Sequence, residues 1–164
     1  DDWWASIQSD IRYAEIPIGD KAANPVMITV HDMHTSDNLP WNQVQIRKGE
    51  AHPKGYYSIN VVEDGRYQFK LYRYSPESGL GLNASIEKID GTSFMDNLPV
   101  GKALDIANGF IEIGGSKFES NAEKSDNFLT VEATLSKGSY ELSSTFLSQE
   151  GAEITAYYTE IEKL

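Results

Sequence analysis

The side chains with the clearest capacity for chemistry lie in the run His31-Asp32-Met33-His34. Imidazole and carboxylate groups are common metal ligands. In an extended strand successive side chains point to opposite faces, so only Asp32 and His34 would share a face. A third ligand would have to come from elsewhere, and a polar strand end that hydrogen-bonds to the next loop accounts for the pattern without a metal. We therefore predict no metal site, and we retain His34 as a ligand-contact candidate.

Paired carboxylates could serve glycoside hydrolysis, which needs two of them at a defined separation. The chain has 25 acidic residues, so chance proximity of two is near certain. No pair among Asp90, Asp96, Asp105 and Glu112 stands out from the surrounding Gly and Asn residues. Calcium-loop, phosphate-loop and Gly-x-Ser-x-Gly motifs are absent from the sequence, and it contains no cysteine. We predict no catalytic residue, no cofactor and no enzymatic activity for this chain alone.

A polar aromatic segment, Asn38-Leu39-Pro40-Trp41-Asn42-Gln43, is the most distinctive feature of the chain. Trp41 follows a proline, and its neighbours Asn42 and Gln43 can both donate and accept hydrogen bonds. An aromatic face beside fixed polar groups can hold the apolar face of a sugar ring. An indole of this kind can equally plug a core. Trp41, Asn42 and Gln43 are therefore contact candidates, with both interpretations of Trp41 open.

Two arginines, Arg47 and Arg73, are the best local anion binders if they are exposed. In an alternating strand Arg73 shares the face of Phe69 and Leu71, so its charge must leave the core edge or meet a carboxylate. A structural ion pair with Glu77 or another acid is the favoured interpretation. Both arginines remain ligand-contact candidates.

The formal net charge of −11 disfavours nucleic acid and anionic membrane surfaces as partners. A sulfated ligand would need locally placed Arg and Lys. No apolar stretch reaches the ~20 residues needed to span a bilayer, so no membrane insertion is predicted. The chain begins with Asp1-Asp2-Trp3-Trp4 rather than Met, which favours a piece excised from something longer.

Period-2 alternation bounded by turn residues predicts about ten short strands. They form an all-β, antiparallel β-sandwich or jelly roll, in one domain over 1–164 with 1–12 as an N-terminal arm or short helix. Asp64-Gly65 predicts a hairpin, and Trp3–Ile11 is the only predicted helix. The predicted strands are Tyr13–Ile18, Pro25–Val30, Gly55–Val62, 67–72, Asn83–Ile89, Ala103–Ile106, Phe110–Ile113, Phe128–Leu135, Tyr140–Phe146 and Ile154–Ile161.

Several short motifs carry a family likeness through their order and spacing. They are Ile16-Pro17-Ile18-Gly19-Asp20, Asn24-Pro25-Val26, His31-Asp32-Met33-His34-Thr35, Pro40-Trp41-Asn42-Gln43, Ile46-Arg47-Lys48-Gly49, Gly55-Tyr56-Tyr57, Asp64-Gly65-Arg66-Tyr67, Leu71-Tyr72-Arg73-Tyr74-Ser75-Pro76-Glu77, Ala156-Tyr157-Tyr158 and Glu162-Lys163-Leu164. Together they resemble the C-terminal region of bacterial arylsulfatases, the formylglycine-dependent sulfatases of the alkaline phosphatase superfamily. The sequence departs from that pattern at Met33 and Tyr74, where the family commonly has Trp.

The family's Cys/Ser-x-Pro-x-Arg signature, which supplies the formylglycine nucleophile, is absent from this sequence. The resemblance therefore implies a non-catalytic accessory domain, whose partner is a sulfatase catalytic domain that hydrolyses sulfuric esters. Residues Asp37–Gln43 would border its substrate path. It also implies a periplasmic or extracellular location. A free-standing carbohydrate-binding module, with a glycan as partner, and a purely structural domain remain the alternatives.

Overall fold

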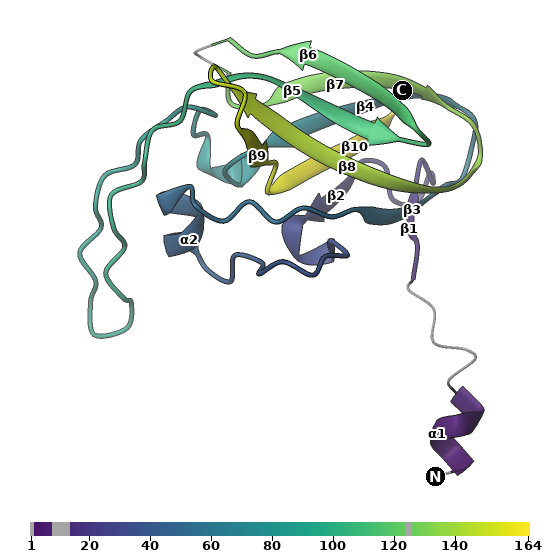
Figure 1. Ribbon diagram of the computed structural model, residues 1–164, viewed down its shortest axis with the longest axis horizontal. Coiled ribbons are helices and arrows are strands. Elements are labelled where there is room, and N and C mark those ends of the chain that lie inside the picture. Colours follow the sequence, from purple (N-terminus) through teal and green to yellow (C-terminus); the bar gives the residue numbers. More distant parts are fainter. Residues whose placement is uncertain (1, 8–13, 124–125) are drawn as a thin grey trace.

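The computed structural model describes residues 2–7, 14–123 and 126–164, and its main body is two packed β-sheets (Figure 1). The described helices are α1 (Asp2–Ile7) and α2 (Gln43–Lys48), with short 3₁₀ turns η2 (Val30–Asp32) and η3 (Pro76–Ser78). The strands are β1 (Ile16–Ile18), β2 (Val26–Thr29), β3 (Tyr57–Val61), β4 (Gly65–Tyr72), β5 (Ile106–Ile113), β6 (Ser116–Asn121), β7 (Leu129–Leu135), β8 (Gly138–Ser148), β9 (Glu153–Thr155) and β10 (Tyr158–Lys163).

One sheet has six strands in the order β1-β3-β8-β5-β6, with β9 also paired to β8. The other has four in the order β2-β10-β4-β7. All strand pairs are antiparallel except β1–β3, which is parallel. The predicted all-β sandwich is confirmed, with this one departure from an antiparallel arrangement.

The core follows from the alternation along the strands. Tyr57, Ile59 and Val61 on β3 are fully buried, and so are Tyr67, Phe69 and Leu71 on β4. Every second side chain of a strand points to the same face, so these residues form the facing inner surfaces of the two sheets. Full burial of each large apolar side chain stabilises the fold by about 1.5–3 kcal/mol.

The hairpin predicted at Asp64-Gly65 is wrong. Strand β3 belongs to the six-stranded sheet and β4 to the four-stranded sheet, so this turn crosses between layers. The β7–β8 connection crosses between the same layers. The two corners are joined, because the Asp64 carboxylate accepts a hydrogen bond from the Lys137 amide at 2.6 Å. A local turn signal gives chain reversal but not the sheet that the second strand joins.

Several strand predictions also need correction. Segment Asn83–Ile89 is not a strand and makes only isolated bridges, Ile86 with Gly101 and Ile89 with Leu98. The predicted strands Ala103–Ile106 and Phe110–Ile113 are not two separate strands. Strand β5 runs from Ile106 to Ile113, and residues 103–105 belong to the connection before it. The last predicted strand is divided into β9 and β10 around Ala156 and Tyr157. Strand β6 was missed because it pairs only with β5 and none of its side chains is fully buried.

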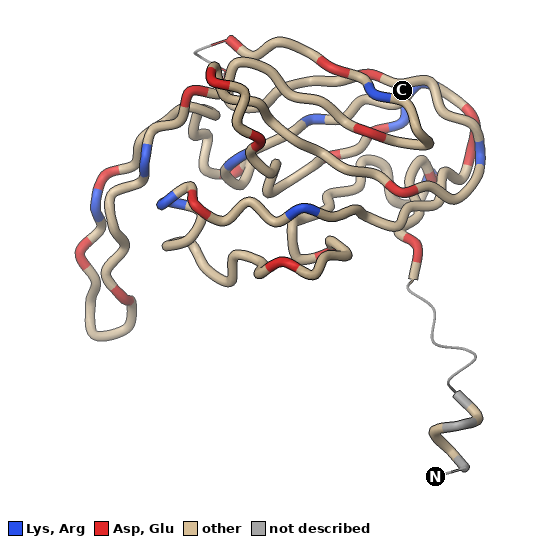
Figure 2. The backbone as a smooth tube through the Cα atoms, in the orientation of Figure 1, with Lys and Arg blue, Asp and Glu red and all other residues tan. Residues whose placement is uncertain are grey.

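The helical prediction was incomplete. Helix α1 accounts for the first part of Trp3–Ile11, and residues 8–13, including the predicted arm boundary and Tyr13, lie outside the described residues. Helix α2 was not predicted. Within the described ranges no helix is long and apolar enough to cross a membrane. Figure 2 shows acidic residues on both sheets and on the long excursion between η3 and β5, in keeping with the net charge of −11.

Candidate functional site

Trp41 is held by the N-terminus of α2. Asn42 caps this helix from an extended backbone conformation, and its side-chain oxygen accepts a hydrogen bond from the Gln45 amide at 3.3 Å. Gln45 in turn uses its side-chain oxygen to accept the Trp41 amide hydrogen at 2.5 Å. The first bond supports the Gln45 amide, which also donates to the Asn42 carbonyl at 3.2 Å, and the second satisfies the amide of Trp41 just before the cap. The backbone of Trp41 is therefore fixed on both sides.

The other end of α2 is closed by Gly49. This residue has φ 61° and ψ 40°, the left-handed conformation that glycine adopts without strain, and its amide donates to the carbonyls of Gln45 and Ile46. Arg47 and Lys48 occupy the last turn, where positive charge interacts favourably with the helix dipole. An Asn cap, basic residues in the last turn and a terminal Gly are ordinary helix signals, and they could have revealed α2 in the sequence.

The Trp41 side chain is 79% exposed, which answers the question that the sequence left open. Its ring lies beside that of His31, with centroids 6.3 Å apart. His31 Nε2 lies 2.7 Å from the Pro40 carbonyl oxygen, so the imidazole ties the loop to η2. Trp41 is a surface residue on a well-anchored backbone.

A hollow of about 420 Å³ opens beside this loop, between residues 37–38, α2 and residues 50–53. The Asp37 carboxylate accepts a hydrogen bond from the Lys54 amide at 2.8 Å, and the Thr35 hydroxyl donates to the Lys54 carbonyl at 2.6 Å. These bonds fix one wall of the hollow against the segment leading into β3. Most of the residues that line it have polar side chains: Asp37, Asn38, Gln45, Lys48, Glu50, Ala51, His52 and Pro53.

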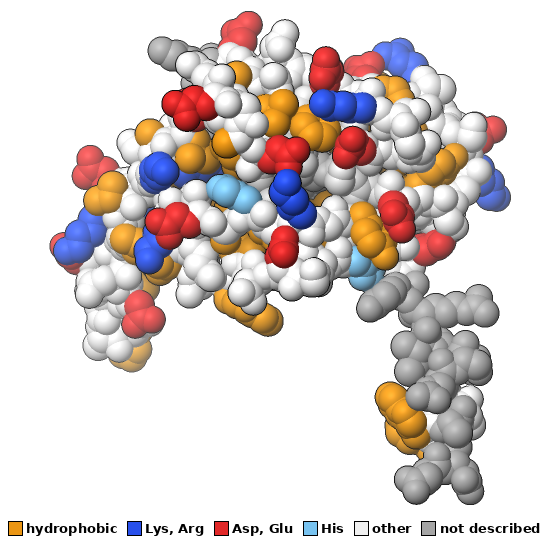
Figure 3. All heavy atoms as spheres, in the orientation of Figure 1, with side chains coloured by type: hydrophobic (Ala, Val, Ile, Leu, Met, Phe, Trp, Pro, Cys, Tyr) orange, Lys and Arg blue, Asp and Glu red, His pale blue; other side chains and the backbone are white. Residues whose placement is uncertain are grey.

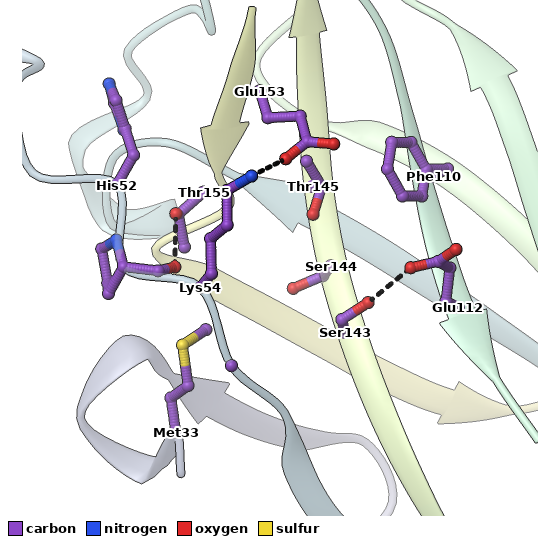
Figure 4. Close-up of a pocket in the computed structure, with 12 residues that line it drawn as sticks. Met33, His52, Lys54, Phe110, Glu112, Ser143, Ser144, Thr145, Glu153 and Thr155 are labelled. Carbon is purple, nitrogen blue, oxygen red and sulfur yellow. Dashed lines mark hydrogen bonds and ion pairs between the residues drawn. The ribbon is translucent and has the colours of Figure 1, made fainter. Parts of the chain in front are cut away.

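A second hollow, of about 150 Å³, lies on the outer face of the six-stranded sheet, and it shares His52 and Pro53 with the first. Figure 4 shows Lys54 reaching across it to Glu153, with Lys54 Nζ and Glu153 Oε2 2.6 Å apart. On the neighbouring strands Ser143 donates weakly to Glu112 at 3.5 Å. A third hollow, of about 590 Å³, continues over β5 and β8 and shares Gly55, Glu112 and Ser143 with the second.

We call these three adjoining hollows the groove. Figure 3 shows the face with β5, β8 and β9, on which acidic and basic side chains are interspersed around hollowed surface. The charged side chains lining the groove are three lysines and five carboxylates, which gives a small negative excess. They are Lys48, Lys54 and Lys117, and Asp37, Glu50, Glu112, Glu141 and Glu153.

His52 lies where the first two hollows meet. Its Nε2 lies 3.0 Å from the Gly49 carbonyl oxygen, and its ring is stacked on that of Tyr157 with centroids 6.4 Å apart. Burial lowers the pKa of His52, the Gly49 hydrogen bond opposes this shift, and the charges of Arg73 and Lys102 add to the lowering. The imidazole is therefore neutral at neutral pH, with Nε2–H donating to the carbonyl.

The predicted site residues do not converge on one point. Trp41, Asn42 and Gln43 lie together at the start of α2. His34 exchanges backbone hydrogen bonds with Tyr56, and the two rings lie 5.2 Å apart.

The two arginines are buried, which corrects their nomination as anion binders. Arg47 Nη1 donates to the carbonyls of Glu87 and Pro99, at 2.9 and 3.0 Å. Arg73 is fully buried and donates to the carbonyls of Leu82, Ala84 and Lys102. The carboxylate expected for Arg73 is replaced by this set of carbonyl oxygens. Neither guanidinium is available to a dissolved anion.

The His31–Asp32 pair is also structural. The Asp32 carboxylate accepts from the Thr29 amide at 2.8 Å and from the Thr29 hydroxyl at 3.1 Å, and it closes the turn at η2. In the described part of the chain no cluster of three or more His, Asp or Glu side chains could hold a metal ion.

Several groove residues carried no functional prediction. No functional role is predicted from the sequence for His52, Lys54, Ser143 or Glu153, and Glu112 is considered only as one of the carboxylates among which no pair stands out. Outward alternation along β5 and β8 places Glu112 and Ser143 on one face, but only the register shows that they are directly opposite.

No family model matches the chain, and no curated protein matches its sequence. A search of solved structures does find chains of similar structure. A ruminal GH26 endo-β-1,4-mannanase is 19% identical, with a TM-score of 0.44 over 85% of this chain and 26% of the mannanase. The Podospora anserina GH26-CBM35 β-(1,4)-mannanase is 10% identical, with a TM-score of 0.38 over 84% of this chain and 27% of its own. A CBM35 from Cellvibrio japonicus Abf62 is 9% identical, with a TM-score of 0.36 over 85% of this chain and 96% of the CBM35 chain.

This chain spans about a quarter of the length of either mannanase. The likenesses are too distant to assign a ligand or a site. None of these comparisons tests the resemblance to arylsulfatases, which stays a prediction.

Proposed function

We propose that this β-sandwich is a non-catalytic carbohydrate-binding module that holds a neutral glycan chain in the groove, with Trp41 at one end. The observation that carries the proposal is the 79% exposure of an indole whose backbone is fixed by Gln45 and the Asn42 cap. An aromatic side chain on a fixed backbone loses less conformational entropy on binding than one on a mobile loop. Its face is suited to the apolar C–H face of a sugar ring.

The polar groups of the first hollow, which Gln45 links to the Trp41 backbone, support a hydroxyl-rich ligand. Asn38 and Gln45 carry amides, and Asp37 and Glu50 carry acceptors, within the hollow of about 420 Å³. Sugar hydroxyls both donate and accept, so a mixed set of this kind can pair with them. The open continuation across the outer face of β5 and β8 suits a chain rather than a single ring.

The charge of the groove supports a neutral glycan over a sulfated one. Five carboxylates outnumber three lysines among the lining residues, and Lys54 is already paired with Glu153. The two arginines that could have bound sulfate are buried against backbone carbonyls. A polyanion would therefore meet net repulsion at this surface.

The arylsulfatase resemblance is compatible with this proposal, because it concerns the larger protein to which such a module would belong. An accessory module of this kind would keep a glycan near the catalytic domain of a sulfatase-like protein, in the periplasm or outside the cell. We expect the chain alone to hydrolyse neither sulfate esters nor glycosides. A purely structural role is the competing proposal, and the same experiment decides between them.

The test is a binding titration that isolates the Trp41 signal. The chain contains three tryptophans, so a Trp3→Phe/Trp4→Phe double variant leaves Trp41 as its sole indole. Neutral mannan, xylan and β-glucan oligosaccharides, and one sulfated glycan, are titrated while Trp emission and the heat of binding are recorded. We expect a neutral glycan to shift the Trp41 emission, and Trp41→Ala to weaken its binding at least tenfold, or about 1.4 kcal/mol.

Trp3→Ala is the matched control, because this indole is 71% exposed but lies on α1. It should leave affinity unchanged. Binding that survives Trp41→Ala unaltered would rule out the Trp41 contact. Absence of binding to every neutral glycan would favour a structural role, and preference for the sulfated glycan would reverse the charge argument.

A further inference from the structure

The long connection between η3 and β5 forms a hairpin-like excursion over residues 86–101, which we call the finger. It is the teal projection at the lower left of Figure 1 and extends away from both sheets. Its two sides are joined by backbone bridges between Ile86 and Gly101, between Ile89 and Leu98, and between Thr92 and Met95 at the tip. The Asn97 side chain also accepts the Gly91 amide hydrogen at 2.9 Å. The finger is therefore an ordered element with its own hydrogen bonds.

Two buried arginines hold the base of the finger. Arg47 bonds to one carbonyl on each side, those of Glu87 and Pro99, and the Arg47 carbonyl accepts the Lys102 amide hydrogen at 2.8 Å. Arg73 bonds to the carbonyls of Ala84 and Lys102, which precede and follow the finger. Burial of a guanidinium is costly unless its donors are used, and burial lowers the pKa of Arg73. The anchoring fixes the direction in which the finger projects.

The finger carries exposed apolar side chains that contribute nothing to the core. Among the described residues ten large hydrophobic side chains are notably exposed, and four belong to the finger. Phe94 at the tip is 98% exposed, Val100 63%, Met95 46% and Ile89 39%. Exposed apolar groups gathered on one projecting element mark a site that another surface covers.

Charges around the tip indicate what covers it. Glu87, Asp90 and Asp96 are acidic, and the only basic residue among 86–101 is Lys88, whose Nζ pairs with Asp90 at 2.5 Å. Net negative charge beside Phe94 opposes approach to an anionic lipid surface. It favours a protein surface whose apolar pocket is bordered by Lys or Arg.

We propose that the finger is a docking arm that inserts Phe94 and Met95 into an apolar pocket of a partner protein, with Asp90 and Asp96 facing basic residues at the pocket rim. A protruding aromatic anchor of this kind is how a few residues come to dominate an interface. The finger and the glycan groove are separate surfaces, so either proposal can fail without the other.

The test places a photoreactive group at the tip of the full chain, as Phe94→p-benzoylphenylalanine, in the producing cell. We expect adducts with one protein, mapped by mass spectrometry to an apolar pocket flanked by Lys or Arg. Unlabelled chain should compete with this adduct, and the Phe94→Ser chain should compete at least tenfold less well. Titration of the purified partner should show the same loss for Phe94→Ser and for Asp90→Lys/Asp96→Lys.

Met27→p-benzoylphenylalanine is the control, because this apolar side chain is 39% exposed on the edge strand β2, away from the finger. Phe94→Ser should leave the urea midpoint and glycan binding unchanged, since the ring is almost fully exposed. Adducts with phospholipid, with glycan, with a second copy of the chain or with many proteins alike would overturn the proposal. So would equal competition by the Phe94→Ser chain, or no adduct at all.

Discussion

The side-chain oxygen of Gln45 accepts the backbone amide hydrogen of Trp41 at 2.5 Å, one helical turn back along the chain. This bond couples α2 to the exposed indole, because Gln45 cannot move without freeing the residue before the helix cap. The same side chain lines the first hollow, of about 420 Å³. Gln45 therefore both anchors the Trp41 backbone and lines the hollow that we propose as part of the glycan site.

Replacing Gln45 should weaken both the stability of the fold and the binding of a glycan. Gln45→Ala removes the acceptor for the Trp41 amide and should lower the free energy of unfolding by about 0.5–1.5 kcal/mol. Glycan affinity should fall for two reasons: the Gln45 side-chain amide no longer contacts the glycan, and the backbone that carries the Trp41 indole is less firmly held. Urea denaturation and calorimetric titration measure the two effects. Gln149→Ala, an exposed glutamine outside the groove, is the control, and equal loss in both variants would contradict the coupling.

Arg73 should be one of the most sensitive positions of the described chain. Arg73→Ala leaves carbonyls of Leu82, Ala84 and Lys102 without their guanidinium donor in a buried site, at a cost of about 3 kcal/mol or more. Arg73→Lys should recover little of this, since one ammonium cannot reproduce the planar fork. Urea denaturation of both variants is the measurement. A loss below about 1 kcal/mol for Arg73→Ala would show that the anchoring is dispensable.

Acid should destabilise the fold partly through His52. Its pKa is lowered in the folded state by burial, so between that pKa and the unfolded value of about 6.5 the unfolded chain binds more protons. Stability therefore falls as pH drops below about 6.5. His52→Gln should flatten the stability profile between pH 7 and 5.5 relative to the wild type, measured by urea denaturation across that range. Parallel profiles for the two proteins would exclude His52 as a source of the slope.

The corner bond between Asp64 and Lys137 gives a further prediction. Asp64→Ala removes the acceptor for the Lys137 amide and should cost about 1 kcal/mol, whereas Asp64→Asn keeps an acceptor oxygen and should cost less. Thermal unfolding of the two variants compares them directly. If Asn proved as damaging as Ala, charge rather than the hydrogen bond would be responsible.

Local patterns in the sequence were sufficient wherever one residue's environment follows from its near neighbours. Alternation identified the buried faces of β3 and β4, as at Ile59 and Phe69, because side chains two positions apart must point the same way. The same logic missed α2, although Asn42 and Gly49 bound it, because a single turn and a half of helix has no apolar stripe long enough to show a period.

The candidate site depended more on tertiary structure. Trp41 was identified from its polar neighbours, but its exposure was undetermined, since a loop indole can turn either way. Arg73 was expected on a core face, and the structure supplied carbonyl oxygens in place of a carboxylate. Lys54, Glu112 and Glu153 come together only because β8 lies beside β5 and β9 and also pairs with β3, the strand that Lys54 leads into.

The sequence by itself determined the class of fold and the side chains that face the core, because strand alternation is a property of consecutive residues. Only the tertiary structure decided which strands share a sheet. Asp64-Gly65 reverses the chain whether β4 joins β3 or crosses to the other layer, and the choice was made by β10 and β7 pairing with β4. Those partners lie far away in the sequence, so the apolar surface that they bury jointly has no signature at the turn.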